Sequence, residues 1–154
     1  MSKTYYKVLT PDLKSVNEVF HKDSAFLGGG LAQQAKDLVV QYGIGQLTKP
    51  KLEGTALMVF DSLDAVNDFM IRNSLKNSKV LHGMHRCRVF EVEVQHPRRQ
   101  GLFVYQPWWS SYFQDFFEVL TLLRRKKKYR NRCNTYCPKG TVFCSAVKLV
   151  REVK

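Results

Sequence analysis

The alternation of hydrophobic and polar residues predicts five or six short β-strands. The clearest is Cys87–Val94, where Phe90, Val92 and Val94 alternate with charged residues, so that one strand face is apolar and the other is solvated. Thr55–Phe60 is a continuous apolar run, which is typical of a buried strand. Further strands are predicted over residues 4–10, 37–42, 102–105 and 141–150, the last as one strand or two.

Two helices are predicted where apolar residues recur at spacings of three and four. The first follows Asp61 and Ser62, whose side-chain oxygens can cap a helix that begins there. The second follows Ser110 or Ser111, and acidic residues precede basic ones along it, as the helix dipole favours. The apolar face of the first helix consists of Leu63, Val66, Phe69 and Met70, and that of the second of Phe113, Phe116, Phe117, Leu120 and Leu123.

These elements predict an α+β fold in a single compact domain that spans residues 1–154, since this length is typical of one domain. Strands and helices do not alternate regularly, which favours α+β over a doubly wound sheet. We expect a mixed, mainly antiparallel sheet of five to six strands with two main helices packed on it. The residues expected to be buried together are Leu57, Val59, Val66, Phe69, Phe90 and Val92.

Four segments of this framework resemble, in their order along the chain, small proteins of phages and large DNA viruses. The segments are Val40–Gly45, Gly54–Leu63 with the helix after it, Val89–Val94 and Gly140–Leu149. The resemblance leaves out the predicted helix at Trp108–Arg132. Those proteins have no established activity, so the resemblance implies a viral setting and no particular chemistry.

Positive charge is concentrated toward the end of the chain. The whole chain has a formal net charge of +12, and residues 124–154 contain 11 Lys and Arg against Glu152 alone, a net of +10. Residues 1–96 contain 12 basic and 10 acidic residues, a net of only +2. A uniform excess would indicate general solubility, whereas this concentration indicates a basic face or tail that has a partner.

Most of this charge forms a basic run inside the C-terminal segment 124–139. Consecutive charges surround a helix on all sides, so the run must be solvated or neutralised by a partner. Each Lys or Arg placed on a phosphate displaces a counterion, so such a cluster binds nucleic acid without reading its sequence. An acidic protein surface and a solvated helix end are the alternatives. The basic run comprises Arg124, Arg125, Lys126, Lys127, Lys128, Arg130 and Arg132.

A dense group of aromatic residues lies directly before the basic run. Aromatic side chains beside cations can stack on unpaired bases, although burial in a core or in a protein interface is the commoner role. The residues assigned to a candidate interface are Trp108, Trp109 and Tyr112.

The cysteines do not predict a metal site. Cys133 and Cys137 are separated by three residues, which is loose for a zinc knuckle, and no second such pair exists in the sequence. His82, His85 and Cys87 are conceivable distant ligands but lie where a strand begins. We expect free thiols in a reducing compartment, with no metal and no cofactor.

No catalytic residue is predicted. Cys144 and His96 are of the types that form a nucleophile and its base, but nothing in their spacing links them. Glu91 and Glu93 share one strand face and could form a carboxylate pair, although solvated glutamates on an edge strand are commoner. Gly28–Gly30 lacks the Gly-Lys-Ser/Thr that a phosphate-binding loop requires.

The sequence therefore predicts a non-enzymatic basic binding module, of viral origin, that contacts nucleic acid without sequence specificity through the basic run. A minor structural protein that makes contacts between virion subunits is the first alternative, and an enzyme with an unrecognised site is the second. No stretch approaches the roughly 18 apolar residues of a membrane span, and Lys7, Asp12 and Lys14 interrupt the first segment. We expect no membrane contact and no secretion, with the protein in the host cytoplasm, the nucleus or the virion.

Overall fold

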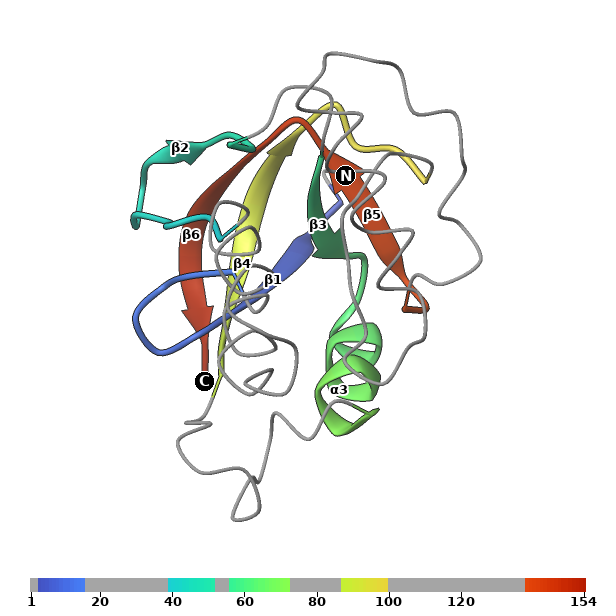
Figure 1. Ribbon diagram of the computed structural model, residues 1–154. Coiled ribbons are helices and arrows are strands. Elements are labelled where there is room, and N and C mark those ends of the chain that lie inside the picture. The colour runs from blue at the N-terminus through green and yellow to red at the C-terminus, as the bar shows by residue number, and fades with distance from the viewer. Residues whose placement is uncertain (1–2, 16–38, 52–55, 73–86, 100–137) are drawn as a thin grey trace, which may run out of the picture.

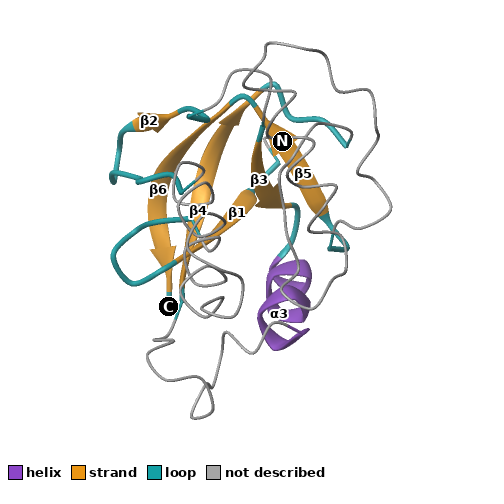
Figure 2. Ribbon diagram, in the orientation of Figure 1, coloured by secondary structure: helices purple, strands orange, loops and turns teal. Residues whose placement is uncertain are grey.

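The computed structural model describes residues 3–15, 39–51, 56–72, 87–99 and 138–154. Within these residues the chain forms a six-stranded antiparallel sheet and one helix (Figures 1 and 2). The strand order is β2-β6-β4-β1-β3-β5, so that β2 and β5 lie at the edges. The elements are β1 Tyr5–Leu9, β2 Leu47–Thr48, β3 Leu57–Phe60, α3 Leu63–Arg72, β4 Arg88–Gln95, β5 Thr141–Cys144 and β6 Ala146–Val153.

This architecture confirms an α+β fold with a sheet of six strands, and it corrects two details of the prediction. Among the described residues all neighbouring strands pair antiparallel, so this part of the sheet is antiparallel rather than mixed. β4 lies between β1 and β6 rather than at an edge. The described residues include one helix instead of two, because the second predicted helix and the strand predicted at 102–105 lie outside them.

The sheet carries a hydrophobic core on each face, because successive strand residues point to opposite sides. What we call the first core consists of Leu9, Val40, Tyr42, Leu57, Val59, Phe90, Val92, Val142, Cys144, Val147 and Leu149. The second core, under α3, consists of Val8, Met58, Phe60, Ala65, Val66, Phe69 and Met70. The six residues expected in one core are all buried but are divided between the two, with Val66 and Phe69 in the second.

Helix α3 begins and packs as its sequence indicates. The Ser62 hydroxyl oxygen accepts a hydrogen bond from the Ala65 amide at 3.2 Å, which satisfies one free donor of the first turn. The Phe69 ring lies 5.0 Å from the Phe60 ring, so the helix is fixed against β3 (Figure 1). Gly140 closes the turn before β5 with φ of 78°, and a Cβ there would lie 2.5 Å from Ala65 Cβ. The helix start therefore requires a glycine at this turn.

The segment before β2 lies across the first core. Its Tyr42 amide donates to the Leu13 carbonyl oxygen at 2.9 Å, and the Ser15 amide donates to the Val40 carbonyl oxygen at 2.9 Å. These bonds hold Val40 and Tyr42 over the sheet, where both are buried. The strand predicted over residues 37–42 is thereby replaced, in its described part, by a single bridge between Lys14 and Gln41.

A β-bulge interrupts the pairing of β6 with β4. Glu91 pairs with Arg151 and Val92 pairs with Leu149, so Val150 has no partner across the ladder. The bulge lets Leu149 and Glu152, three positions apart, contribute to the same face of the sheet: Leu149 belongs to the first core, and Glu152 binds Arg88.

Candidate functional site

The residues that the sequence assigned to binding lie outside the described part of the chain. This applies to the basic run and to the three candidate interface residues Trp108, Trp109 and Tyr112. It also applies to the candidate zinc ligands apart from Cys87. The described residues, which form the sheet and α3, show how charged and reactive side chains are arranged on the folded part of the chain.

Cross-strand ion pairs neutralise most of the charge on β4 and β6. Arg151 binds Glu91 at 2.7 Å and Lys148 binds Glu93 at 3.1 Å, and each pair joins residues that are direct register partners. The two glutamates are therefore separate anions, each with its own cation. This arrangement does not favour a carboxylate pair for acid–base chemistry.

The other face of the same two strands has a third pair. The Arg88 guanidinium donates to both carboxylate oxygens of Glu152, at 2.9 and 2.7 Å, and lies over the Phe90 ring. The hydrogen bond from Arg88 lowers the pKa of Glu152 below its ordinary value. This bidentate pair holds the last residues of β6 against β4.

Asp61 forms a charged junction where β3 passes into α3. Both Arg99 and Lys3 form ion pairs with its carboxylate, and its amide donates to the Gly140 carbonyl oxygen at 3.0 Å. Burial alone would raise the pKa of Asp61, but the hydrogen bond and charge of Arg99, together with Lys3, bring it below the ordinary value. The junction ties residues 3, 61, 99 and 140 together.

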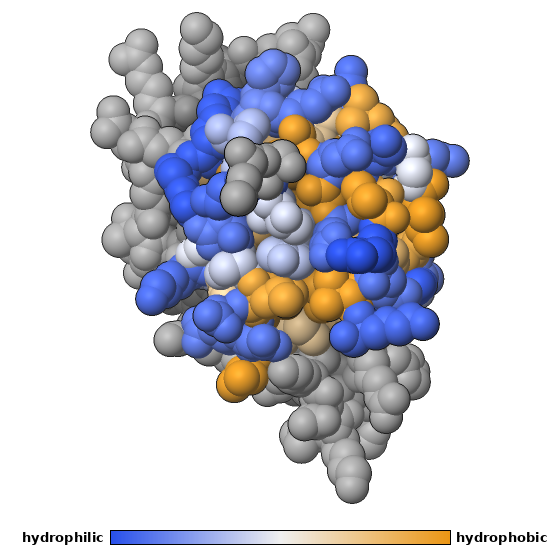
Figure 3. Space-filling model, turned by 180° about the vertical axis from the view of Figure 1, so that it is seen from behind, coloured by the Kyte–Doolittle hydropathy of each residue, from blue (hydrophilic) through white to orange (hydrophobic). Residues whose placement is uncertain are grey.

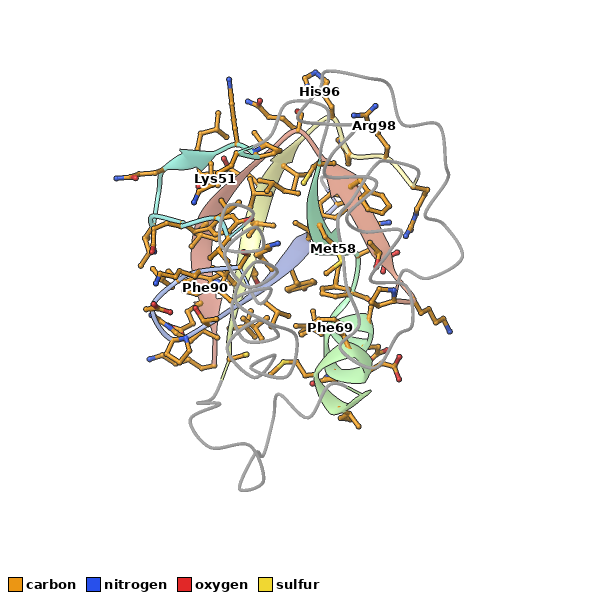
Figure 4. All side chains as sticks on the ribbon, viewed as in Figure 1. Lys51, Met58, Phe69, Phe90, His96 and Arg98 are labelled. Atoms are coloured by element: carbon orange, nitrogen blue, oxygen red, sulfur yellow. The ribbon has the colours of Figure 1, made fainter. Side chains whose placement is uncertain are left out.

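Five exposed cations in the described part of the chain differ from these paired ones, namely Lys49, Lys51, Arg98, Lys139 and Lys154. We call the first three the basic rim. Among the residues that the structure describes, no carboxylate forms an ion pair with any of the three. Figure 4 shows Lys51 on the side of β2 and Arg98 at the top of the molecule, both in its upper half. Among the described residues, the rim cations therefore lie toward this end of the sheet without an ion-pair partner.

His96 and Ser145 meet at the same end of the sheet. The His96 Nδ1 atom lies 2.8 Å from the Ser145 hydroxyl oxygen, and this hydroxyl donates to the Gln95 carbonyl oxygen at 3.3 Å. The direction of the hydrogen bond between the ring nitrogen and the serine hydroxyl depends on the tautomer of His96, so this contact by itself does not assign a general base. Cys144, next in sequence, points into the first core, away from exposed His96.

A group of three titratable side chains is buried in the first core. The Lys7 Nζ atom donates to the Met58 carbonyl oxygen at 2.6 Å and lies 5.3 Å from the centroid of the Tyr42 ring. The Cys144 thiol donates to the Leu57 carbonyl oxygen at 3.3 Å. The buried Tyr42 hydroxyl has no hydrogen-bond partner among the residues that the structure describes.

Burial sets the protonation of this group. It lowers the pKa of Lys7 to about 8, although the neighbouring Cys144 opposes the shift. It raises the pKa of Cys144 to about 11 and that of Tyr42 above its ordinary value. An amine with a lowered pKa is a nucleophile type, but Lys7 is only 5% exposed and the thiol is fully buried. The geometry thus favours a structural role over nucleophilic catalysis.

Sequence reasoning missed Lys7, although a signal for it exists. Within the first strand, Tyr5, Lys7 and Leu9 share one face because side chains alternate. Leu9 belongs to the first core and Tyr5 packs against it, which places the lysine between two apolar neighbours. The lysine had been interpreted only as a charge that interrupts an apolar segment.

The described residues contain no group of three or more His, Cys, Asp and Glu side chains that could hold a metal ion. The two cysteines in this part of the chain are free and lie on opposite faces, Cys87 against the second core and Cys144 in the first. Burial raises the pKa of the Cys87 thiol to about 11. This thiol is therefore protonated at neutral pH.

Three large apolar side chains are exposed along the edge formed by β2 and β6. They are Ile44 at 61%, Leu47 at 48% and Val150 at 49%. Figure 3, seen from behind, shows hydrophobic side chains among hydrophilic ones on the side of the molecule where β2 and β6 lie.

Comparison of the chain with known protein families, with characterised proteins and with solved structures found no match. Within the described residues, α3 is too short and too polar to cross a membrane.

Proposed function

We propose that the protein is a non-enzymatic binding module that contacts nucleic acid through the basic run, without sequence specificity. The observation that carries the proposal is the segregation of charge. On the described body, six cations form ion pairs with five carboxylates. Residues 124–132 contain seven cations and no carboxylate at all.

Phosphate is the counter-charge that such a run binds best. Seven closely spaced cations repel one another in solution, and a polyanion removes this repulsion while its condensed counterions are released. Contacts to phosphates carry no base information, so we expect similar affinity for different sequences. The resemblance to phage and viral proteins supports a role inside an infected cell or in the virion.

The test is a salt titration of binding to random-sequence duplex and single-stranded DNA and RNA. Four to six phosphate contacts give a slope of log affinity against log salt of about −3 to −5. Changing Arg124, Arg125, Lys126, Lys127 and Lys128 to Gln should abolish most of the binding and flatten the slope. We expect the fold to survive, because Gln is compatible with the helix that the sequence predicts there. Absence of wild-type binding even at low salt would end this proposal.

A structural protein of the virion is the second candidate function. It is favoured by the exposed apolar side chains Ile44, Leu47 and Val150 along one edge of the sheet. In that case the run variant would fail in co-assembly with virion subunits, and nucleic-acid affinity would be negligible at physiological salt. Apolar assembly contacts would also hold or strengthen as salt rises, in contrast to phosphate contacts.

A further inference from the structure

We infer that the basic rim is a second phosphate-binding surface, so that nucleic acid contacts the folded sheet as well as the basic run. This inference rests on the proposed function, because it names further residues that meet the same polyanion. The rim consists of Lys49, Lys51 and Arg98, none of which the sequence had singled out.

The strand register brings these residues to one end of the sheet. Thr48, the last residue of β2, pairs with Val147, and Gln95, the last residue of β4, pairs with Ala146. β2 and β4 thus both end beside the start of β6. The chain continues from β2 into Lys49 and Lys51, and from β4 through His96 to Arg98.

The backbone holds part of the rim in place. The Arg98 amide donates to the Phe143 carbonyl oxygen at 2.7 Å, and the Phe143 amide donates to the Arg98 carbonyl oxygen at 2.8 Å. This bridge fixes the residue against the outer edge of β5. A cation on a fixed backbone loses less freedom when it binds a phosphate, and this applies to Arg98.

The charge environment separates the rim from every paired cation nearby. Lys148, one residue from the Val147 that faces the end of β2, is neutralised by Glu93 at 3.1 Å. Arg99, adjacent to Arg98, is neutralised by Asp61. The rim side chains lack such a partner among the described residues and are exposed, so they are available to an external anion.

The composition of the rim fits a phosphodiester backbone better than a protein. A specific protein interface has an apolar, desolvated centre with charges around it. The rim side chains are exposed cations beside Pro50, Gln95 and Pro97, and the exposed apolar Leu47 lies two positions before Lys49. Separate cations with room for water are typical of contacts to successive phosphates.

The experiment compares two triple variants of the full chain that lose the same side-chain types. The rim variant is Lys49→Gln, Lys51→Gln and Arg98→Gln. The control variant is Lys14→Gln, Lys148→Gln and Arg151→Gln, which also removes two lysines and one arginine, all of them ion-paired. Binding to a short random-sequence DNA duplex is measured by fluorescence anisotropy over a range of salt, and a thermal melt checks that each variant is folded.

We expect the rim variant to reduce the magnitude of the salt slope by about 2–3 and to weaken binding about tenfold or more near 0.1 M salt. The control variant should keep the wild-type slope. Equal losses in both variants would show an effect of net charge alone, and a rim variant that binds like the wild type would show that phosphates do not reach this surface. Either result overturns the inference while the run variant still tests the proposed function. No binding by the wild-type chain would overturn both.

Discussion

Replacing Lys7 with methionine removes the buried amine of the first core and keeps a side chain of similar length. The wild-type lysine has a pKa of about 8 in the folded protein, lowered from 10.5 by burial. A difference of this size corresponds to about 3 kcal/mol at 1.36 kcal/mol per unit. At neutral pH Lys7 is charged in the folded wild type. Its charge lowers the free energy of unfolding by about 3 kcal/mol relative to a folded protein in which Lys7 is neutral.

The sign of the pH dependence follows from proton binding. As pH rises above about 8 the folded protein loses the Lys7 proton, whereas the unfolded chain keeps it up to about 10.5. The unfolded chain then binds more protons, so this lysine makes the free energy of unfolding increase with pH between these values. The methionine variant lacks this gain. The free energy of unfolding of the variant minus that of the wild type should fall by about 3 kcal/mol across the window.

The assay is urea unfolding of both proteins with a reducing agent present, at pH 7 and pH 10. Cys144 and Tyr42 face the amine and remain in both proteins, so their titration in the unfolded chain cancels in the difference, whereas the coupling between Cys144 and Lys7 in the folded protein does not. Lys49→Met, which removes an exposed amine, is the control for the loss of one charge. A stability difference between wild type and Lys7→Met that does not change with pH would refute the reasoning.

Two further predictions concern packing. Phe69→Ala should lower the free energy of unfolding by about 3–5 kcal/mol, because the ring is buried against Phe60, and an unchanged melting temperature would contradict this. Gly140→Ala should cost more stability than Gly45→Ala in urea unfolding: both glycines have positive φ, but only at Gly140 would the added Cβ meet another atom, Ala65 Cβ at 2.5 Å.

The local pattern of the chain predicted the elements that have strong periodicity. β4 and α3 were predicted because their apolar residues recur at the spacing of a strand and of a helix. β2 could not be predicted, since it is only two residues long, Leu47–Thr48, and exists through its pairing with β6. The internal position of β4 was also missed, because strand order depends on pairings between distant segments and leaves no mark in the local pattern.

The charged residues of the candidate site show the same difference between local patterns, which the sequence displays, and pairings between distant residues, which it does not. The basic run is visible in the sequence because its cations are consecutive. The pairing of Glu91 with Arg151, 60 positions apart, depends on a register that the sequence does not display. Without that register, an ion-paired cation such as Lys148 cannot be told from Lys49, which forms no ion pair with a described residue, so the basic rim could not be predicted.

The sheet lies between the two cores and separates their side chains, so that each core packs independently of the other. A cavity made by shortening Phe69 can be filled only by other residues of the second core. The hydrogen-bonded backbone of the sheet separates these residues from Val147, which belongs to the first core. Losses of stability from the two sides should therefore add, as they do at sites that share no contact. Substitutions can therefore accumulate in one core during evolution while the packing of the other core remains intact.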